Sequence, residues 1–301
     1  MNMAELNRTS GPEEKAYVKT KSSKWTPGKI CAIVLKYAVL IFSAFVMLVP
    51  LVVVLFGAFK TNDEFKSTSV LAMPESWFNF DNFVTAFTKG NMLHAFGNTI
   101  IVVGVSVVIT IFLGTMTAFV INRFKFRFSR IVNTAFLVAS LVPSITMQMS
   151  VFQIISKLGL FGKTSSLILL YAGTDIISIY IFVQFLENIS VSLDESAIMD
   201  GASYFTIYRK ILLPLMKPAI VTVLIIKGVG FYNEFYTPFL YTPSPEKAVI
   251  STALFKFKGP YGSQWEVICA GALITIIPSL IIFLFLQKQI YSGLTTGAVK
   301  E

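Results

Sequence analysis

Residues 195–214 read ESAIMDGASYFTIYRKILLP and form a moderately polar block between two long apolar runs. Asp200-Gly201 divides the block, because glycine readily adopts the left-handed backbone conformation of a tight turn. Ser192-Leu-Asp-Glu195 has the spacing of a capping box, which predicts that a short helix begins there. Ser203 can cap a second helix. The block therefore predicts two short helices joined by a turn.

The second helix has an apolar face and a defined end. Apolar side chains recur at helical spacing on Phe205, Tyr208, Ile211, Leu212 and Leu215. Pro214 has no backbone N–H, so it should kink this helix as the chain enters the next apolar run. We expect a rigid helix–turn–helix unit, called the bracket here (residues 192–215). Ala197 and Gly201 are small, so a partner can approach the backbone of the bracket closely.

Composition places the chain in a membrane. Of its 301 residues 54% are hydrophobic and only 14% are charged, whereas a soluble domain has about a quarter charged residues. The net charge of +9 does not indicate nucleic-acid binding, because the basic residues lie beside apolar runs and not along one face. The cysteines Cys31 and Cys269 form no CxxC motif. With His94 as the sole histidine, we expect no catalytic residue, metal site or cofactor.

Six apolar runs are each close to the roughly 20 residues that a helix needs to cross a bilayer. They are continuous and do not alternate, which favours helices over a barrel. The sequence thus predicts an all-α membrane protein with six transmembrane helices. The runs are Tyr37–Phe59, Thr99–Ile121, Ile131–Ser156, Ser165–Leu186, Ala219–Tyr241 and Val267–Gln287.

Lysine and arginine set the orientation of these helices. The strongest cluster is RFKFRFSR, residues 123–130, directly after the second run. The positive-inside rule places this cluster and both termini in the cytoplasm. The loop between helices four and five, residues 187–217, is then cytoplasmic too, while residues 60–98 and 242–266 lie outside. We expect a partly disordered N-terminal tail (1–30), a transmembrane domain (31–290) and a C-terminal tail (291–301) in the cell (plasma or inner) membrane.

The bracket resembles a known motif. Glu195-Ser196-Ala197, then three residues, Gly201, then nine residues and Ile211-Leu-Leu-Pro214 match the EAA loop of binding-protein-dependent ABC importer permeases, with Ser196 where the family usually has alanine. FYNEF at residues 231–235 looks like the WNEF element of the family, with Tyr232 in the tryptophan position. LTTGAVK at residues 294–300 resembles the C-terminal tail of MalG-like carbohydrate permeases of the maltose/multiple-sugar type.

This resemblance implies a non-catalytic permease subunit of an ATP-driven importer for a sugar or oligosaccharide. It also implies two cytoplasmic ABC ATPase subunits, a second permease subunit of different sequence and an extracytoplasmic solute-binding protein. The EAA loop would be the coupling helix that seats in the ATPase. By resemblance, the residues that couple to the ATPase are Glu195, Ser196, Ala197, Asp200, Gly201, Ile211 and Pro214.

Ionisable residues within the apolar runs are candidates for function, because burying a charge in hydrocarbon is costly. Asp175, Lys227 and Glu234 are of this kind. Lys227 and Glu234 share a helix face but lie about 10 Å apart along the axis, too far for a direct pair. Lys227 could instead snorkel to the interface, with Glu234 hydrogen-bonded near the outer leaflet. The aromatic residues between Phe231 and Tyr241 could stack on a sugar ring or form an interfacial belt. Candidates for the translocation pathway or the permease interface are Tyr232, Asn233, Glu234 and Tyr236.

The outer loop from Pro243 to Gly262 resembles the segment that in this family reaches into the binding protein. Its candidate contact residues are Lys256, Lys258 and Tyr261. Two other functions stay open at this level. The same architecture could import a solute other than a sugar, or the chain could be a stand-alone secondary transporter, although no related halves with broken helices are seen.

Overall fold

The computed structural model describes residues 27–124, 129–173, 175–259 and 262–298, and these are mostly helical. The chain divides into two units between Leu51 and Val52. The described part of the first unit belongs to helix α1 (Pro27–Phe59). The stretch of α1 from Ile30 to Phe59 is long and apolar enough to cross a membrane. Apart from α1, the elements described below belong to the second unit.

The second unit is a sequence of helices with one very short β pair. Its strands β1 (Lys258–Gly259) and β2 (Gly262–Ser263) are antiparallel, with Lys258 opposite Ser263. The helices are α2 (Asn62–Ser67), α3 (Asp81–Lys89), α4 (Met92–Arg123), α5 (Ser129–Ser140), α6 (Ser144–Lys157), α7 (Thr164–Tyr171), α8 (Ile176–Glu187), α9 (Ser192–Met199), α10 (Tyr204–Ile207), the π-helix η1 (Tyr208–Leu212), α11 (Leu213–Leu215), α12 (Lys217–Asn233), α13 (Tyr236–Tyr241), the 3-10 helix η2 (Pro245–Lys247), α14 (Ile250–Ala253), the 3-10 helix η3 (Leu254–Phe257) and α15 (Trp265–Ala298).

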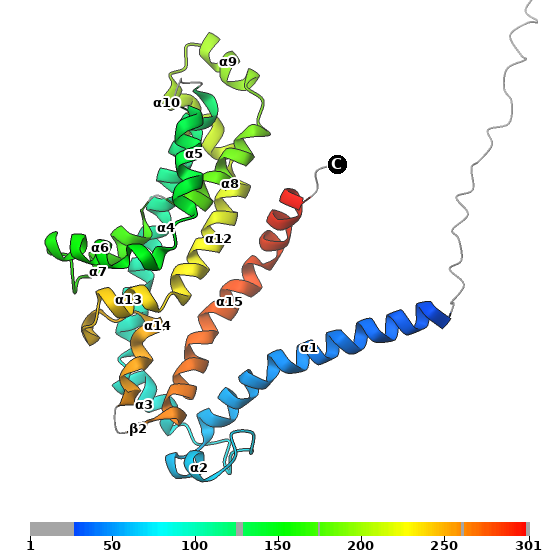
Figure 1. The fold of residues 1–301 in the computed structure, drawn as a ribbon, viewed down its shortest axis with the longest axis vertical. Coiled ribbons are helices and arrows are strands. Elements are labelled where there is room, and N and C mark those ends of the chain that lie inside the picture. Colours follow the sequence, from blue (N-terminus) through cyan, green and yellow to red (C-terminus); the bar gives the residue numbers. More distant parts are fainter. Residues whose placement is uncertain (1–26, 125–128, 174, 260–261, 299–301) are drawn as a thin grey trace, which may run out of the picture. The chain divides into compact units, whose positions relative to one another are not determined.

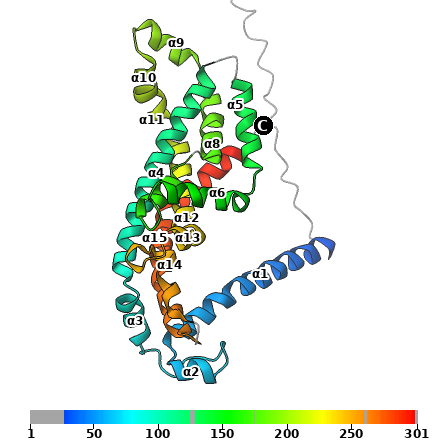
Figure 2. The same cartoon turned by 60° about the vertical axis from the view of Figure 1, so that its left-hand side comes forward.

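Four long helices form the body of this unit. Helix α4 packs along α8 and α12, and α12 packs along α15, as Figure 1 shows and Figure 2 confirms from another side. The bracket helices α9 and α10 lie at one end of this body, and α2 and α3 lie at the other. Helix α4 has 32 residues and is therefore about 48 Å long, so it extends from the α3 end to the bracket end.

The six continuous spans are not confirmed. Among the described residues three helices can cross a membrane by length and apolar composition, and up to five spans result if two bent pairs each count as one. The bent pairs are α7 with α8, at 40°, and Tyr204–Leu215 with α12, at 72°. The third predicted run is divided into α5 and α6, because Pro143 precedes α6 in an extended conformation that does not continue a helix.

The fourth and fifth runs are interrupted as well. Asp175 adopts an extended conformation between α7 and α8 and caps α8. Glu234 is extended after α12, and the chain then forms α13. A polar side chain that bonds the free N–H groups of a new helix stabilises such a break. Hydrophobicity therefore identified the apolar runs but did not predict the breaks in the helices within them.

The largest buried cluster joins the bracket to the helix body. Phe119 of α4, Phe182 of α8, Tyr208 and Leu212 of the bracket and Val223 of α12 all belong to it. Phe182 and Leu212 are fully buried. Burying an aromatic or leucine side chain stabilises a fold by about 1.5–3 kcal/mol. The bracket is thus part of the packed core and not a loose loop.

Candidate functional site

The bracket begins with α9 and turns at glycine, as predicted. Gly201 has φ +80°. Its N–H donates to the carbonyl of Ile198, and the N–H of Ala202 donates to the carbonyl of Ala197, both at 2.9 Å. These two bonds define a Schellman motif, which satisfies carbonyls at the helix end and requires a left-handed residue. The predicted turn at Asp200-Gly201 is confirmed.

The predicted capping box at the start of α9 is wrong. Val191 is the residue before α9, and no side chain caps the helix. The Ser192 hydroxyl instead pairs with the Ser190 hydroxyl at 2.7 Å. A capping box does occur at α2, where Thr61 Oγ1 accepts the N–H of Glu64 at 3.2 Å and Glu64 Oε2 accepts the N–H of Thr61 at 3.3 Å. Residue spacing alone did not distinguish these two sites.

The second half of the bracket agrees with the predictions from the sequence. Ser203 Oγ accepts the N–H of Thr206 at 3.3 Å and caps α10. At the end of the π-helix the N–H of Leu213 bonds to the carbonyl of Tyr208, five residues back. Pro214 follows and can donate no bond, and the chain then bends by 72° into α12. The predicted kink is confirmed, and a π-helical turn accompanies it.

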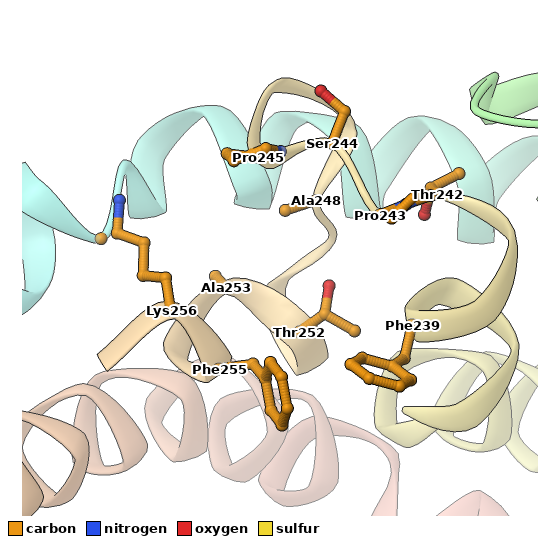
Figure 3. A pocket seen from close by; sticks show the side chains of 11 residues that line it. Phe239, Thr242, Pro243, Ser244, Pro245, Ala248, Thr252, Ala253, Phe255 and Lys256 are labelled. Carbon is orange, nitrogen blue, oxygen red and sulfur yellow. The ribbon is translucent and has the colours of Figure 1, made fainter. Parts of the chain in front are cut away.

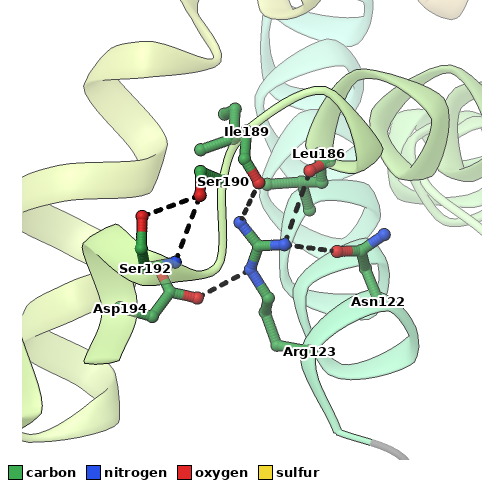
Figure 4. A network of polar contacts seen from close by, with 7 residues as sticks. All are labelled: Asn122, Arg123, Leu186, Ile189, Ser190, Ser192 and Asp194. Carbon is green, nitrogen blue, oxygen red and sulfur yellow. Dashed lines mark hydrogen bonds and ion pairs between the residues drawn. The ribbon is translucent and has the colours of Figure 1, made fainter. Parts of the chain in front are cut away.

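An arginine fastens α9 to α4. Arg123, the last residue of α4, forms an ion pair with Asp194 of α9, with 2.7 Å between Nε and Oδ2. Its guanidinium also donates to the carbonyls of Ile189 at 2.9 Å and Leu186 at 3.5 Å, and to Asn122 Oδ1 at 2.9 Å (Figure 4). The side chains of the ion pair are only 7% and 10% exposed. The planar fork of arginine suits several acceptors at once.

Tyrosine provides the second attachment of the bracket. Tyr208 Oη lies 2.9 Å from Thr115 Oγ1 of α4 in a buried hydrogen bond. Its ring packs against Phe119, with centroids 5.5 Å apart. Ile207 and Leu212 beside it are fully buried. One face of the bracket is therefore locked to α4 and α8 by charge, hydrogen bonds and apolar packing.

The opposite face of the bracket is open. Met199 is 88% exposed and Phe205 is 61% exposed. The predicted residues Glu195, Ser196, Asp200, Gly201 and Pro214 are exposed, and Ile211 is half-buried. Ala197 differs, because it is only 8% exposed and packs in the buried cluster. Its small side chain lets α9 approach the core, and its role at an ATPase contact stays a prediction.

The ionisable residues of the spans form a pair that was not predicted. Lys227 Nζ of α12 lies 2.7 Å from Asp175 Oδ1, and both side chains are 17% exposed. Asp175 Oδ2 accepts the N–H of Ser178 at 3.1 Å and also its hydroxyl. Glu234 has a different role, since its Oε1 accepts the N–H of Thr237 at 3.0 Å at the start of α13. Lys227 and Asp175 are 52 residues apart in the chain, so their contact depends on helix packing.

Of the other candidates for the pathway or the permease interface, some contact a neighbouring helix and others are exposed. Tyr232 Oη donates to the carbonyl of Thr275 at 2.8 Å and so connects α12 to α15. Asn233 is exposed, and its amide donates to the carbonyl of Val229 at 3.0 Å. Tyr236 is 49% exposed. Of the four candidates Tyr232, Asn233, Glu234 and Tyr236, the second and the fourth are thus exposed, and the other two are half-buried.

The loop after α13 surrounds an open cavity of about 300 Å³. Figure 3 shows Phe239 and Phe255 on one side of it and Lys256 at its edge. Asn98 of α4 holds the loop by donating to the carbonyls of Glu246 at 3.0 Å and Ala248 at 2.9 Å. The predicted contact residues Lys256 and Lys258 are exposed, and Tyr261 lies outside the described residues.

These features define a class of protein: a helical, multi-pass membrane protein with a rigid, one-sided bracket at one end of its helix body. Residues 110–295 match the family of binding-protein-dependent transport system inner membrane components. The match covers more than half of the chain, and the chain belongs to this family.

Curated relatives and a solved structure agree with the family match. The chain is 31% identical to the "probable starch degradation products transport system permease protein AmyC" of Thermoanaerobacterium thermosulfurigenes, over 84% of this chain and 91% of AmyC. It is 28% identical to the arabinooligosaccharides transport system permease protein AraQ of Halalkalibacterium halodurans, over 86% of this chain and 93% of AraQ. The fold also matches a chain of a bacterial ABC transporter involved in alginate import, with a TM-score of 0.78 and 19% identity, over 88% and 98% of the two chains.

Proposed function

We propose that this chain is a permease subunit of an ATP-driven, binding-protein-dependent importer for a sugar or oligosaccharide. It forms half of the translocation pathway and performs no chemistry itself. Family membership supports the transport role. The names of AmyC and AraQ refer to starch degradation products and arabinooligosaccharides, which supports a carbohydrate substrate over another solute.

The observation that carries the proposal is the two-sided construction of the bracket. Its inner face is fixed to α4 by Arg123–Asp194 and Tyr208–Thr115. Its outer face exposes Met199 and Phe205, two large apolar side chains at 88% and 61% exposure. An exposed apolar surface rimmed by polar residues is typical of a protein–protein contact. A rigid attachment on one face and an open contact on the other would transmit force from a soluble partner.

We assign that outer face to a separate cytoplasmic ABC ATPase, with Glu195, Asp200 and Gly201 at the contact. Helix α4 is longer than the roughly 30 Å of bilayer hydrocarbon, and the bracket lies at the end of α4 opposite to α3. The basic cluster that starts at Arg123 favours the cytoplasm for the bracket end. The segment from α2 to α3 would then be extracytoplasmic, as would the loop that holds Lys256 and Lys258.

The complex needs partners that this chain does not supply. Each chain has one bracket, so two ATPase subunits require two permease subunits, and we infer that the second is a different chain. The exposed Asn233 and Tyr236 are suited to that interface or to the pathway. The family name itself implies a solute-binding protein, which we place at the extracytoplasmic loops.

Site-directed crosslinking tests the assignment of the bracket. With Cys31 and Cys269 replaced by serine, we would introduce Met199→Cys in the bracket or Phe78→Cys between α2 and α3. The two positions are matched, at 88% and 86% exposure. We expect Met199→Cys to crosslink to an ATPase subunit in native membranes, whereas Phe78→Cys does not. Crosslinks from both positions, or from Phe78→Cys alone, would contradict the assignment.

Transport assays test the substrate. Proteoliposomes that contain the chain, its partner permease, the ATPase and the binding protein should accumulate labelled oligosaccharides only when ATP is inside. Uptake of an amino acid or a metal ion in place of sugars would favour the same architecture with another solute. Uptake that persists after ATP depletion would instead indicate a secondary transporter.

A further inference from the structure

The Lys227–Asp175 ion pair connects α12 to the break between α7 and α8. Asp175 lies at the break between α7 and α8, and its two carboxylate oxygens have different partners. Oδ1 binds Lys227 Nζ of α12 at 2.7 Å, and Oδ2 accepts the backbone N–H of Ser178 at 3.1 Å. One carboxylate thus caps the first turn of α8 and at the same time holds α12. Any displacement of Lys227 acts directly on the beginning of α8.

Helix α12 also holds the other side of this break. Phe231 stacks on Tyr171, the last residue of α7, with centroids 4.5 Å apart and ring planes within 6°. Lys227 and Phe231 are four residues apart, so they project from the same face of α12. This face therefore contacts the end of α7 through Phe231 and the start of α8 through Lys227. Helix α12 thus contacts both sides of the 40° break between α7 and α8.

Separating the charges of the Lys227–Asp175 ion pair is energetically costly. Both side chains are 17% exposed and lie in segments that we place in the membrane, where an unpaired charge is costly. The N-terminal end of α8 further favours the carboxylate. Pulling Lys227 away would leave two uncompensated charges. The pair should therefore move as a unit when α12 moves.

The same helix is connected to the bracket. Helix α12 starts directly after the 72° bend that ends the bracket. Ala219 and Val223, in its first two turns, are buried in the same cluster as Tyr208 and Leu212. A rigid displacement of the bracket therefore tilts α12. Because α12 holds both sides of the break, that tilt changes the angle between α7 and α8.

We infer that the Lys227–Asp175 ion pair is a positioning element that transmits movement of the bracket to the break in the fourth span, so that the pathway opens in step with ATP hydrolysis. The inference rests on the proposed function, because it requires an ATPase that drives the bracket. It assigns to two residues of the spans a role in coupling, and neither of them needs to contact the substrate.

The test separates coupling from stability with a neutral double variant. Lys227→Met and Asp175→Asn each leave one charge without its partner, whereas Lys227→Met/Asp175→Asn removes both charges and leaves no unpaired ion. Lys227→Arg keeps the cation, and Lys66→Met, at an exposed lysine of α2, is the matched control. Each variant would be assembled with its partners in proteoliposomes. Substrate uptake and ATP hydrolysis would then be measured in the same vesicles.

We expect the neutral double variant to assemble and hydrolyse ATP normally while the amount of substrate transported per ATP falls by about 5- to 150-fold, the usual range of coupling between two sites. Lys227→Arg should retain most of the coupling, and Lys66→Met should behave as wild type. A neutral double variant with normal transport per ATP would overturn the inference. A neutral double variant that fails to assemble would assign the pair to stability alone and would overturn it too.

The proposed function fails in a different way. If the wild-type complex shows no ATP-dependent uptake, then the assignment as an importer subunit is wrong. If wild-type uptake is normal and only the ion-pair variants behave unexpectedly, then the transport function stands and the coupling role of Lys227 and Asp175 is wrong.

Discussion

Replacing Arg123 by methionine should release α9 from the helix body. Methionine fills much of the same space but cannot pair with Asp194 or donate to the carbonyls of Ile189 and Leu186. Asp194 is then a buried carboxylate without its cation. Removing one partner of a buried ion pair costs about 3–5 kcal/mol. The low exposure of both side chains, 7% and 10%, places this pair in the buried class.

Hydrogen exchange measured by mass spectrometry can detect this release. The amides of α9, Ser192–Met199, exchange when α9 opens locally. A loss of about 3–5 kcal/mol raises the opening constant by roughly two to three and a half orders of magnitude, since about 1.4 kcal/mol is tenfold. We expect that acceleration in α9 for Arg123→Met. The amides of α12 should change little, because its packing in the core is retained.

Two controls make the result interpretable. Arg209→Gln removes an exposed arginine of the bracket and should leave exchange in α9 unchanged. Arg123→Met/Asp194→Leu removes both charges and should restore most of the protection, because a buried pair replaced by apolar residues is often near neutral. Equal exchange rates in wild type and Arg123→Met would refute the reasoning that this ion pair holds the bracket.

Three further substitutions probe the bracket and its packing. Gly201→Asp should abolish uptake with normal membrane insertion, because an added Cβ meets nothing within 4 Å and the side chain therefore extends into the proposed docking surface. Gly201→Ala is at least as strained at φ +80° but adds no charge, and it should keep most of the uptake. Gly114→Ala should destabilise the fold by about 1–3 kcal/mol through overpacking, since its Cβ would lie 3.0 Å from Phe182. The thermal unfolding midpoint in detergent should therefore fall. Gly104→Ala, with open space around it, should not. Tyr208→Phe should cost about 1 kcal/mol for the lost hydrogen bond to a buried threonine, seen as a smaller shift in the same assay.

The local features of the bracket were readable in the sequence because neighbouring residues determine them. The turn at Gly201 depends on a backbone conformation that glycine adopts without strain. The cap at Ser203 and the bend after Pro214 depend on donors and acceptors a few residues away. The false capping box at Ser192 shows the limit of this reasoning, since the serine hydroxyl had an alternative partner next to it.

The breaks in the apolar runs could not be predicted from hydrophobicity. A run such as 165–186 satisfies the length of a span whether or not its backbone is continuous. Asp175 turns that run into two helices because its carboxylate finds both a cap at Ser178 and a cation at Lys227. The cation comes from another helix. Sequence spacing therefore identified Asp175 as unusual without indicating its partner.

By itself, the sequence determined that this chain is apolar enough for a membrane, that it forms long helices, and that it carries a helix–turn–helix bracket with a family-like spacing. Composition and short-range hydrogen bonding decide these properties. Only the tertiary structure decided which face of the bracket is buried and which charges meet. Arg123 and Asp194 are 71 positions apart, as their numbers show, and Asp175 and Lys227 are 52 apart. Such pairs form because packed helices bring the charges together where water cannot compensate them, and no local pattern encodes that geometry.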